Sequence, residues 1–161
     1  MYSIGMGTPG KPTTGFLIWR LSTKWRVEVD RALAPLGLTH AQFAVLAALA
    51  GMTRAGTQPN QRQLAEFTGL EPLYVSRLAR ALESAGLVER PVHPGDPRAV
   101  RLALTDRGRT VADEAAAIVH ERHAELTKAI GGPDGRRNRE LRETLLADEA
   151  EHEDTPPLSL A

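Results

Sequence analysis

The sequence predicts a mainly α-helical protein with one small two-stranded β wing, and three observations support this. Apolar residues recur at helical spacing through most of the 161 residues. Two short apolar-containing segments, 87–90 and 100–104, flank a loop rich in Pro, Gly and Asp, which is typical of an antiparallel hairpin. The chain is 42% hydrophobic and 25% charged, which is ordinary for a globular domain with a core.

The N-terminal part is expected to be a tail followed by a long helix. Residues 1–14 are rich in Gly, Pro, Ser and Thr, which predicts a flexible tail. A near match to a phosphate-binding loop at 5–11 lacks the Ser or Thr that must follow Lys11, so we favour a plain tail. Residues 15–37 then predict a helix that Pro35 and Gly37 end. It is apolar around too much of its circumference for a lone surface helix, which favours burial against a second subunit.

The next segment predicts two helices joined by a polar loop. Thr39 and Gln42 have the spacing of a capping box, in which each side chain bonds the other residue's backbone N–H. The helix that they begin continues through Leu49, and residues 51–60 form a loop in which Arg54 is more simply part of a connector than a DNA contact. A short helix follows at 61–67, with three residues available for packing: Leu64, Ala65 and Phe67.

A tight turn at 68–71 leads to the segment that carries the chemistry, a helix that begins with Pro72. Four residues at helical spacing form one buried stripe: Val75, Leu78, Ala79 and Leu82. The residues on the other side and its edges are Leu73, Tyr74, Ser76, Arg77 and Arg80. No acid lies between Pro72 and Leu82. A face with a phenol, a hydroxyl and two guanidiniums suits insertion beside phosphates and base edges in a major groove.

The rest of the chain predicts a hairpin and two further helices. Gly86 ends the preceding helix, and Arg98 lies in the hairpin loop, from which an arginine can reach a narrow minor groove. Thr105 is an N-cap for a helix of about 25 residues, or nearly 40 Å, which is longer than a small domain needs. We favour exposed side chains over a metal site for His120 and His123 of that helix, because no third ligand converges on them. A last helix at 138–150 precedes an acidic end that we expect to fray.

Together these motifs resemble the winged helix-turn-helix of the MarR family of bacterial regulators. The matching residues are Leu38-Thr39 with Gln42-Phe43, Val75-Ser76-Arg77-Leu78, Leu82-Glu83 with Gly86-Leu87-Val88 and Arg90, Asp96-Pro97-Arg98, and Leu104-Thr105-Asp106 with Gly108. Their order and spacing between about Leu38 and Gly108 are more specific than any single motif. The resemblance implies a homodimer that binds pseudo-palindromic double-stranded DNA, usually as a repressor released by a small ligand or by oxidation.

The resemblance divides the chain into functional parts. These are a flexible tail (1–14), an N-terminal dimerisation helix (15–37), a winged helix-turn-helix DNA-binding domain (38–105), C-terminal dimerisation helices (106–150) and a flexible acidic tail (151–161). Within the DNA-binding domain we expect Tyr74, Ser76 and Arg77 to read bases and Arg80 to contact phosphate. Arg98 is expected in the minor groove, with Asp96 holding Arg98 or the wing backbone, although Asp96 alone could be an ordinary turn residue.

The formal net charge is zero, but the charges are segregated along the chain. Residues 1–52 hold five basic against two acidic residues, residues 53–105 hold seven against five, and residues 106–161 hold eight against thirteen. The DNA-facing part is therefore net positive and the C-terminal part net negative, which predicts modest non-specific and salt-sensitive specific DNA binding.

The chain contains no cysteine, which removes the thiol on which oxidation sensing depends. We therefore expect a small aromatic or anionic effector, for which Trp19, Trp25, Arg26 and His40 are the candidate pocket residues. For each of them we favour a simpler interpretation: both tryptophans belong to the core, Arg26 is solvated, and His40 is a solvated first-turn residue.

Two other functional classes are less consistent with these residues. A winged domain can serve as a protein–protein module, but a protein partner does not require an acid-free helix face. An enzyme is disfavoured because no complete catalytic constellation is present, and no cofactor or metal is expected. No apolar run approaches the length of a membrane span and no secretory signal begins the chain, so a cytoplasmic protein is expected.

Overall fold

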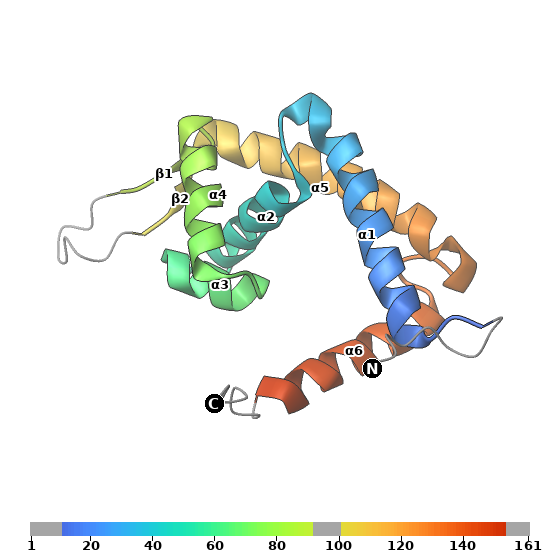
Figure 1. Ribbon diagram of the computed structural model, residues 1–161. Helices are drawn as coiled ribbons and strands as arrows, with labels where there is room; N and C mark the ends of the chain where they lie inside the picture. The colour runs from blue at the N-terminus through green and yellow to red at the C-terminus, as the bar shows by residue number, and fades with distance from the viewer. Residues whose placement is uncertain (1–10, 92–100, 154–161) are drawn as a thin grey trace, which may run out of the picture. The chain divides into compact units, whose positions relative to one another are not determined.

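The computed structural model describes residues 11–91 and 101–153 (Figure 1). The elements in chain order are α1 (Thr14–Leu33), the 3₁₀ helix η1 (Ala34–Leu36), α2 (His40–Arg54), α3 (Gln61–Thr68), α4 (Pro72–Ser84), β1 (Val88–Glu89), β2 (Ala103–Leu104), α5 (Asp106–Thr127), the 3₁₀ helix η2 (Lys128–Ile130) and α6 (Arg136–Glu153). The predicted mainly helical fold with one small antiparallel sheet is confirmed. The chain forms two compact units, one up to Val119 and one from His120 onward, and α5 begins in the first and ends in the second.

Helix α2 is the centre of the first unit, where it contacts α1, α3, α4 and β2. The core is built of aliphatic side chains from all of these elements. Four of its leucines are fully buried: Leu46, Leu49, Leu64 and Leu82. Each leucine that is buried in this way contributes roughly 1.5–3 kcal/mol by leaving water. The helix-turn-helix pair α3 and α4 is therefore held on one central helix.

Side-chain caps fix where the helices begin. The predicted capping box of α2 is present, with 3.2 Å from the Gln42 nitrogen to Thr39 Oγ1 and 2.9 Å from the Thr39 nitrogen to Gln42 Oε1. A second capping box, which the sequence analysis missed, begins α3 through Asn60 and Gln63, with both bonds at 2.9 Å. Its signal was the same spacing, in which a glutamine follows three positions after a capping residue.

Two details of the helix-turn-helix region differ from expectation. The sheet pairs only Val88 with Leu104 and Glu89 with Ala103, so both strands are shorter than the predicted segments. Phe67 was expected to pack, but its side chain is 67% exposed. It lies roughly 110° around α3 from the centre of the buried side formed by Leu64 and Ala65, at about 100° per residue.

The second unit contains the end of α5, η2 and α6. Its turn is held by Asn138, which is buried and donates a hydrogen bond to the Pro133 carbonyl at 2.8 Å. Gly131 follows η2 with a φ of 98°, as the predicted helix stop requires. Helix α6 begins before the predicted residue 138 and continues past 150 to Glu153.

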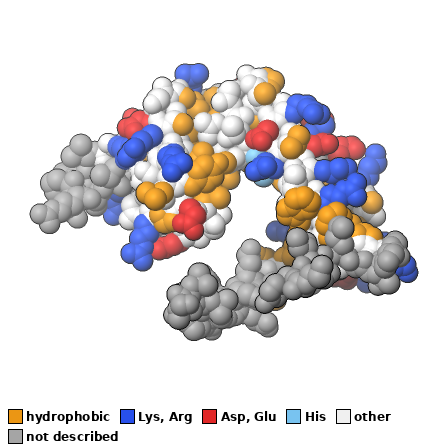
Figure 2. Space-filling model, in the orientation of Figure 1, with side chains coloured by type: hydrophobic (Ala, Val, Ile, Leu, Met, Phe, Trp, Pro, Cys, Tyr) orange, Lys and Arg blue, Asp and Glu red, His pale blue; other side chains and the backbone are white. Residues whose placement is uncertain are grey.

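Helix α1 leaves much of its apolar surface exposed. Five large apolar side chains on it are 46–63% exposed: Leu17, Ile18, Trp19, Leu21 and Val27. Figure 2 shows apolar side chains gathered over the N-terminal part of this helix. Within the described ranges no single helix has the length and composition of a membrane span, and residues 14–36 with 40–54 meet that test only as a pair bent by 75°.

Candidate nucleic-acid interface

Helix α4 presents the residues that the sequence analysis assigned to DNA. Its stripe of Val75, Leu78, Ala79 and Leu82 is buried, as the periodicity predicted. On the opposite side and its edges, Leu73 is 76% exposed, Tyr74 is 43% exposed, Arg77 and Arg80 are exposed, and Ser76 is half-buried. All five side chains are therefore carried by one helix whose other face is fixed in the core.

The arginines on this face have no internal partner among the described residues. Neither Arg77 nor Arg80 makes a side-chain hydrogen bond or ion pair within residues 11–91 and 101–153. Arg62 of the preceding helix, by contrast, pairs with Glu66 at 2.8 Å. Basic and apolar side chains lie side by side over the α3 and α4 region in Figure 2. The guanidiniums of α4 are thus available to an external anion, and phosphate is the anion that they suit.

The C-terminal end of α4 is joined to the start of α3 and to β1 by Arg90, for which the sequence suggested no role. Arg90, which follows β1, pairs with Glu83 of α4 at 2.9 Å between Nε and Oε2. With the Gln61 amide turned to satisfy both groups, its oxygen also accepts from the Arg90 guanidinium at 3.1 and 3.2 Å. The side chain of Arg90 is only 27% exposed. Arg90 therefore links both helices of the helix-turn-helix to the first strand of the wing.

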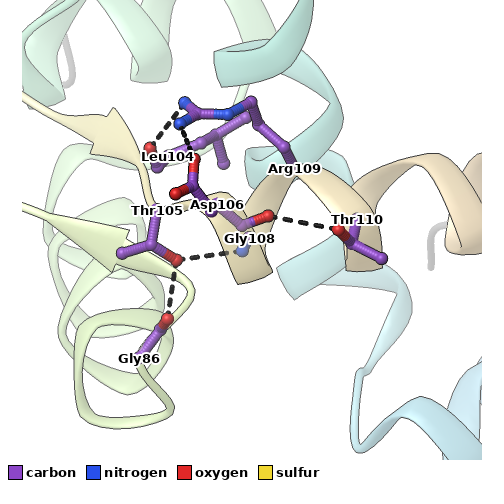
Figure 3. Close-up of polar contacts among 7 residues, drawn as sticks. All are labelled: Gly86, Leu104, Thr105, Asp106, Gly108, Arg109 and Thr110. Carbon is purple, nitrogen blue, oxygen red and sulfur yellow. Dashed lines mark hydrogen bonds and ion pairs between the residues drawn. The ribbon is translucent and has the colours of Figure 1, made fainter.

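A network of polar contacts holds the C-terminal end of α4 against β2 and α5 (Figure 3). The Thr105 hydroxyl donates to the Gly86 carbonyl at 2.7 Å and accepts from the Gly108 nitrogen at 2.9 Å. Arg109 donates to the Leu104 carbonyl at 2.9 Å and pairs with Asp106. Thr105 is thus the predicted N-cap of α5, and it also ties the end of α4 to that helix.

The base of the wing is attached to the loop between α2 and α3. Arg101 donates from Nη1 to the Gln58 carbonyl at 2.6 Å, and the Leu102 nitrogen donates to the Pro59 carbonyl at 3.0 Å. The loop predicted at 51–60 begins later than expected, because Arg54 is the last residue of α2, where it pairs with Asp113 of α5 at 2.8 Å. The predicted wing residues Asp96 and Arg98 lie outside the described residues.

Three of the four predicted pocket residues come together between α1 and α2. The rings of Trp25 and His40 lie edge to face, with centroids 6.2 Å apart. The backbone nitrogen of His40 donates to Asp30 Oδ1 at 2.6 Å. Burial lowers the pKa of the His40 imidazole, Asp30 raises it to a smaller extent, and Arg26 lowers it further. Asp30 was missed because its contact with His40 spans ten residues and two helices.

The structure corrects two interpretations in this region. His40 is half-buried beside Trp25, so it is not the solvated first-turn residue that we favoured. Trp19 is 63% exposed, which excludes it from the core of the chain, whereas Trp25 packs against that core. Trp19 instead lies near Phe16, with ring centroids 6.0 Å apart, and is not placed with His40 by any described contact.

Comparisons with known proteins identify the family. A MarR family model matches residues 36–99. The uncharacterized HTH-type transcriptional regulator YdcH of Bacillus subtilis (strain 168) is 37% identical over 107 residues, which are 66% of this chain and 73% of YdcH. The HTH-type transcriptional repressor Rv2887 of Mycobacterium tuberculosis (strain ATCC 25618 / H37Rv) is 32% identical over 146 residues, which cover 89% of this chain and all of Rv2887.

Solved structures agree in fold. The transcriptional regulator PA3341 is similar with a TM-score of 0.74 and 33% identity, over 89% of this chain and 100% of that one. The repressor CouR bound to a 23-mer DNA duplex has a TM-score of 0.70 and 32% identity, over 86% and 92% of the two chains. Rv2887 in complex with salicylic acid has a TM-score of 0.65 and 30% identity, over 87% and 98%. With its helix-turn-helix, its hairpin and these relatives, the chain belongs to the MarR family of winged-helix transcriptional regulators.

Proposed function

We propose that the protein is a homodimeric repressor that binds a pseudo-palindromic operator through α4 and is released by a small aromatic or anionic ligand. The observation that carries this proposal is the outward face of α4, where Arg77 and Arg80 are exposed and have no ion pair within the described ranges. The repressors Rv2887 and CouR, the latter bound to a DNA duplex, support the same use of this fold. Such a regulator acts in the cytoplasm, and we propose no catalytic activity for it.

The residues have distinct proposed roles on DNA. Tyr74, Ser76 and Arg77 read base edges in the major groove, since the first turns of a recognition helix reach deepest there. Arg80, one turn further on, contacts phosphate. Asp96 and Arg98 act at the tip of the wing, with Arg98 in the minor groove and Asp96 holding it or the loop backbone.

Dimerisation through the terminal helices is supported by their uncovered apolar surface. On α1, Trp19 and Ile18 are 63% and 56% exposed. In the second unit, three leucines of α6 are 48–60% exposed: Leu141, Leu145 and Leu146. Burial of this apolar surface against a second copy of the chain would stabilise a dimer. A two-fold symmetric dimer in turn matches an inverted-repeat DNA site.

A ligand at Trp25, Arg26 and His40 is supported by the chemistry of these residues. An indole face and an imidazole offer stacking surface, and Arg26 is close enough to influence the titration of His40. Rv2887 binds salicylic acid, which is an aromatic acid. CouR binds p-coumaroyl-CoA, in which an aromatic acyl group is joined to the anionic coenzyme A. We keep Trp19 in the proposed pocket for its aromatic surface, although among the described contacts its ring lies near Phe16 and not near His40.

A selection experiment tests the proposal. The full chain is used at near-physiological salt to enrich duplexes from a random pool, and its mass in solution is recorded on the same sample. We expect an inverted repeat with half-sites about one helical turn apart, from a species of twice the chain mass. Salicylate added to the purified complex is expected to release the duplex. A folded dimer that enriches no sequence would overturn the operator-binding role and favour a protein-interaction module.

A further inference from the structure

Leu73 is the most exposed of the large apolar side chains in the described part of the chain, at 76%. It occupies the second position of α4, directly after Pro72. A leucine this exposed contributes little to folding, since burial is what makes an apolar side chain stabilising. Single exposed leucines are common on protein surfaces, so its position on the helix has to give it significance.

That position is the middle of the outward face. At about 100° per residue, Leu73 points almost directly away from the centre of the buried stripe, which lies near Leu82 and Val75. Arg77 and Arg80 follow at i+4 and i+7, on the same side of the helix. The first turn of the basic face is therefore apolar, and the next two turns are cationic.

This order of side chains has a counterpart in DNA. Phosphates and guanine edges attract guanidiniums, whereas the only apolar group that a base presents in the major groove is the C5 methyl of thymine. A protein partner that covered Leu73 would also have to neutralise Arg77 and Arg80, and a nucleic acid satisfies both requirements at once. No acid lies between Pro72 and Leu82 to oppose it.

We infer that Leu73 is a specificity-determining residue that selects thymine in each half-site by covering its C5 methyl group. The inference rests on the proposed operator-binding function and extends it to the kind of base that the tip of α4 reads. Leu73 supplies no hydrogen bond, so it distinguishes thymine from uracil, which differs only by that methyl group.

The test uses the full chain and the duplex obtained by selection. Each thymine of the half-site is replaced in turn by deoxyuridine, and dissociation constants are measured by fluorescence anisotropy. Covering one methyl is expected to change affinity about fourfold, which corresponds to ~0.8 kcal/mol, and substitution in both half-sites about 15-fold. One thymine position per half-site should show this loss with the wild-type protein.

Variants assign the effect to the residue. Leu73→Ala should bind the thymine and deoxyuridine duplexes equally, and Leu73→Met should restore the discrimination. Arg80→Ala is the matched control on the same face: it should weaken both duplexes and leave their ratio unchanged. Because Leu73 and Arg80 are exposed, these changes should leave the fold intact, which circular dichroism verifies.

Two results would overturn the inference, and they are distinguishable. A selected duplex that binds equally well with every thymine replaced, or a Leu73→Ala variant that keeps the full discrimination, removes the methyl contact while operator binding stands. Failure to select any duplex removes operator binding itself, and the inference falls with it.

Discussion

The α-carbon of Gly108 in α5 lies against the backbone of Leu87, which connects α4 to β1. A Cβ built on Gly108 would overlap the Leu87 carbonyl oxygen and lie 2.8 Å from its carbonyl carbon. Backbone atoms of a packed turn cannot move aside as the end of a flexible side chain can. Gly108→Ala is therefore expected to lower the free energy of unfolding by at least about 2 kcal/mol, as measured by urea denaturation.

Gly51→Ala is the matched control for this substitution. Gly51 lies in α2, and a Cβ there meets no atom within 4 Å. Alanine is the better helix former, so this variant should be as stable as the wild type or more stable by up to about 1 kcal/mol. Equal stability of Gly108→Ala and wild type would show that α5 and Leu87 are not in close contact in solution.

His40 predicts how stability depends on pH. Burial lowers the pKa of its imidazole in the folded state, so the unfolded chain binds the proton more readily. Stability is therefore greatest above the ordinary histidine value near 6.5 and is lost as the pH falls below it toward the lowered folded value. Wild-type protein should lose more stability than His40→Gln when urea denaturation is repeated at pH 7.5 and pH 5.5 at one protein concentration. A parallel pH dependence of the two proteins would contradict the assignment.

Arg77 and Arg80 are expected to differ in what they contribute on DNA. Loss of a phosphate contact in Arg80→Ala should weaken binding to all sequences and reduce the slope of log affinity against log salt by about two for a dimer. Arg77→Ala should instead reduce discrimination against altered half-sites, by about 1–3 kcal/mol at one base pair. Anisotropy titrations at several salt concentrations measure both quantities. If the two variants lose affinity equally on every sequence, the assigned roles are wrong.

Trp19 tests the proposed dimer. Trp19→Ser removes the largest exposed apolar side chain of α1 and should raise the dimer dissociation constant by at least tenfold, since interface tryptophans often contribute 2 kcal/mol or more. Sedimentation equilibrium measures the change. Phe67→Ser is the control, because Phe67 is similarly exposed, at 67% against 63% for Trp19, but lies on α3. A Trp19 variant that remains as dimeric as the control would place the interface elsewhere.

Local patterns were sufficient to predict most of the helices. The stripe from Val75 to Leu82 and the caps at Thr39 and Thr105 depend on side chains within one or two turns, so spacing alone predicted them. Phe67 shows the limit of this approach. Its apolar character suggested burial, but the direction of a side chain at the end of an eight-residue helix depends on where neighbouring helices cross it.

Contacts between distant residues could not be predicted in the same way. Asp30 reaches His40 across two helices, and Arg90 reaches Gln61 across the whole helix-turn-helix. Each needs a turn geometry that the sequence pattern does not specify. The outward residues of α4 were easier to predict, because a helix with one buried stripe leaves only one face for the rest.

The separation of roles within α4 has an evolutionary consequence. Its inward residues and the anchors at Arg90 and Thr105 maintain the fold, whereas Leu73, Arg77 and Arg80 make no described hydrogen bond or ion pair through their side chains. Substitutions at these outward positions leave folding almost unaffected. Under the proposed role of α4 in DNA binding, a duplicated copy of the gene could therefore acquire a new target sequence through substitutions that leave stability unchanged, and the ancestral and derived proteins would not compete for the same promoters.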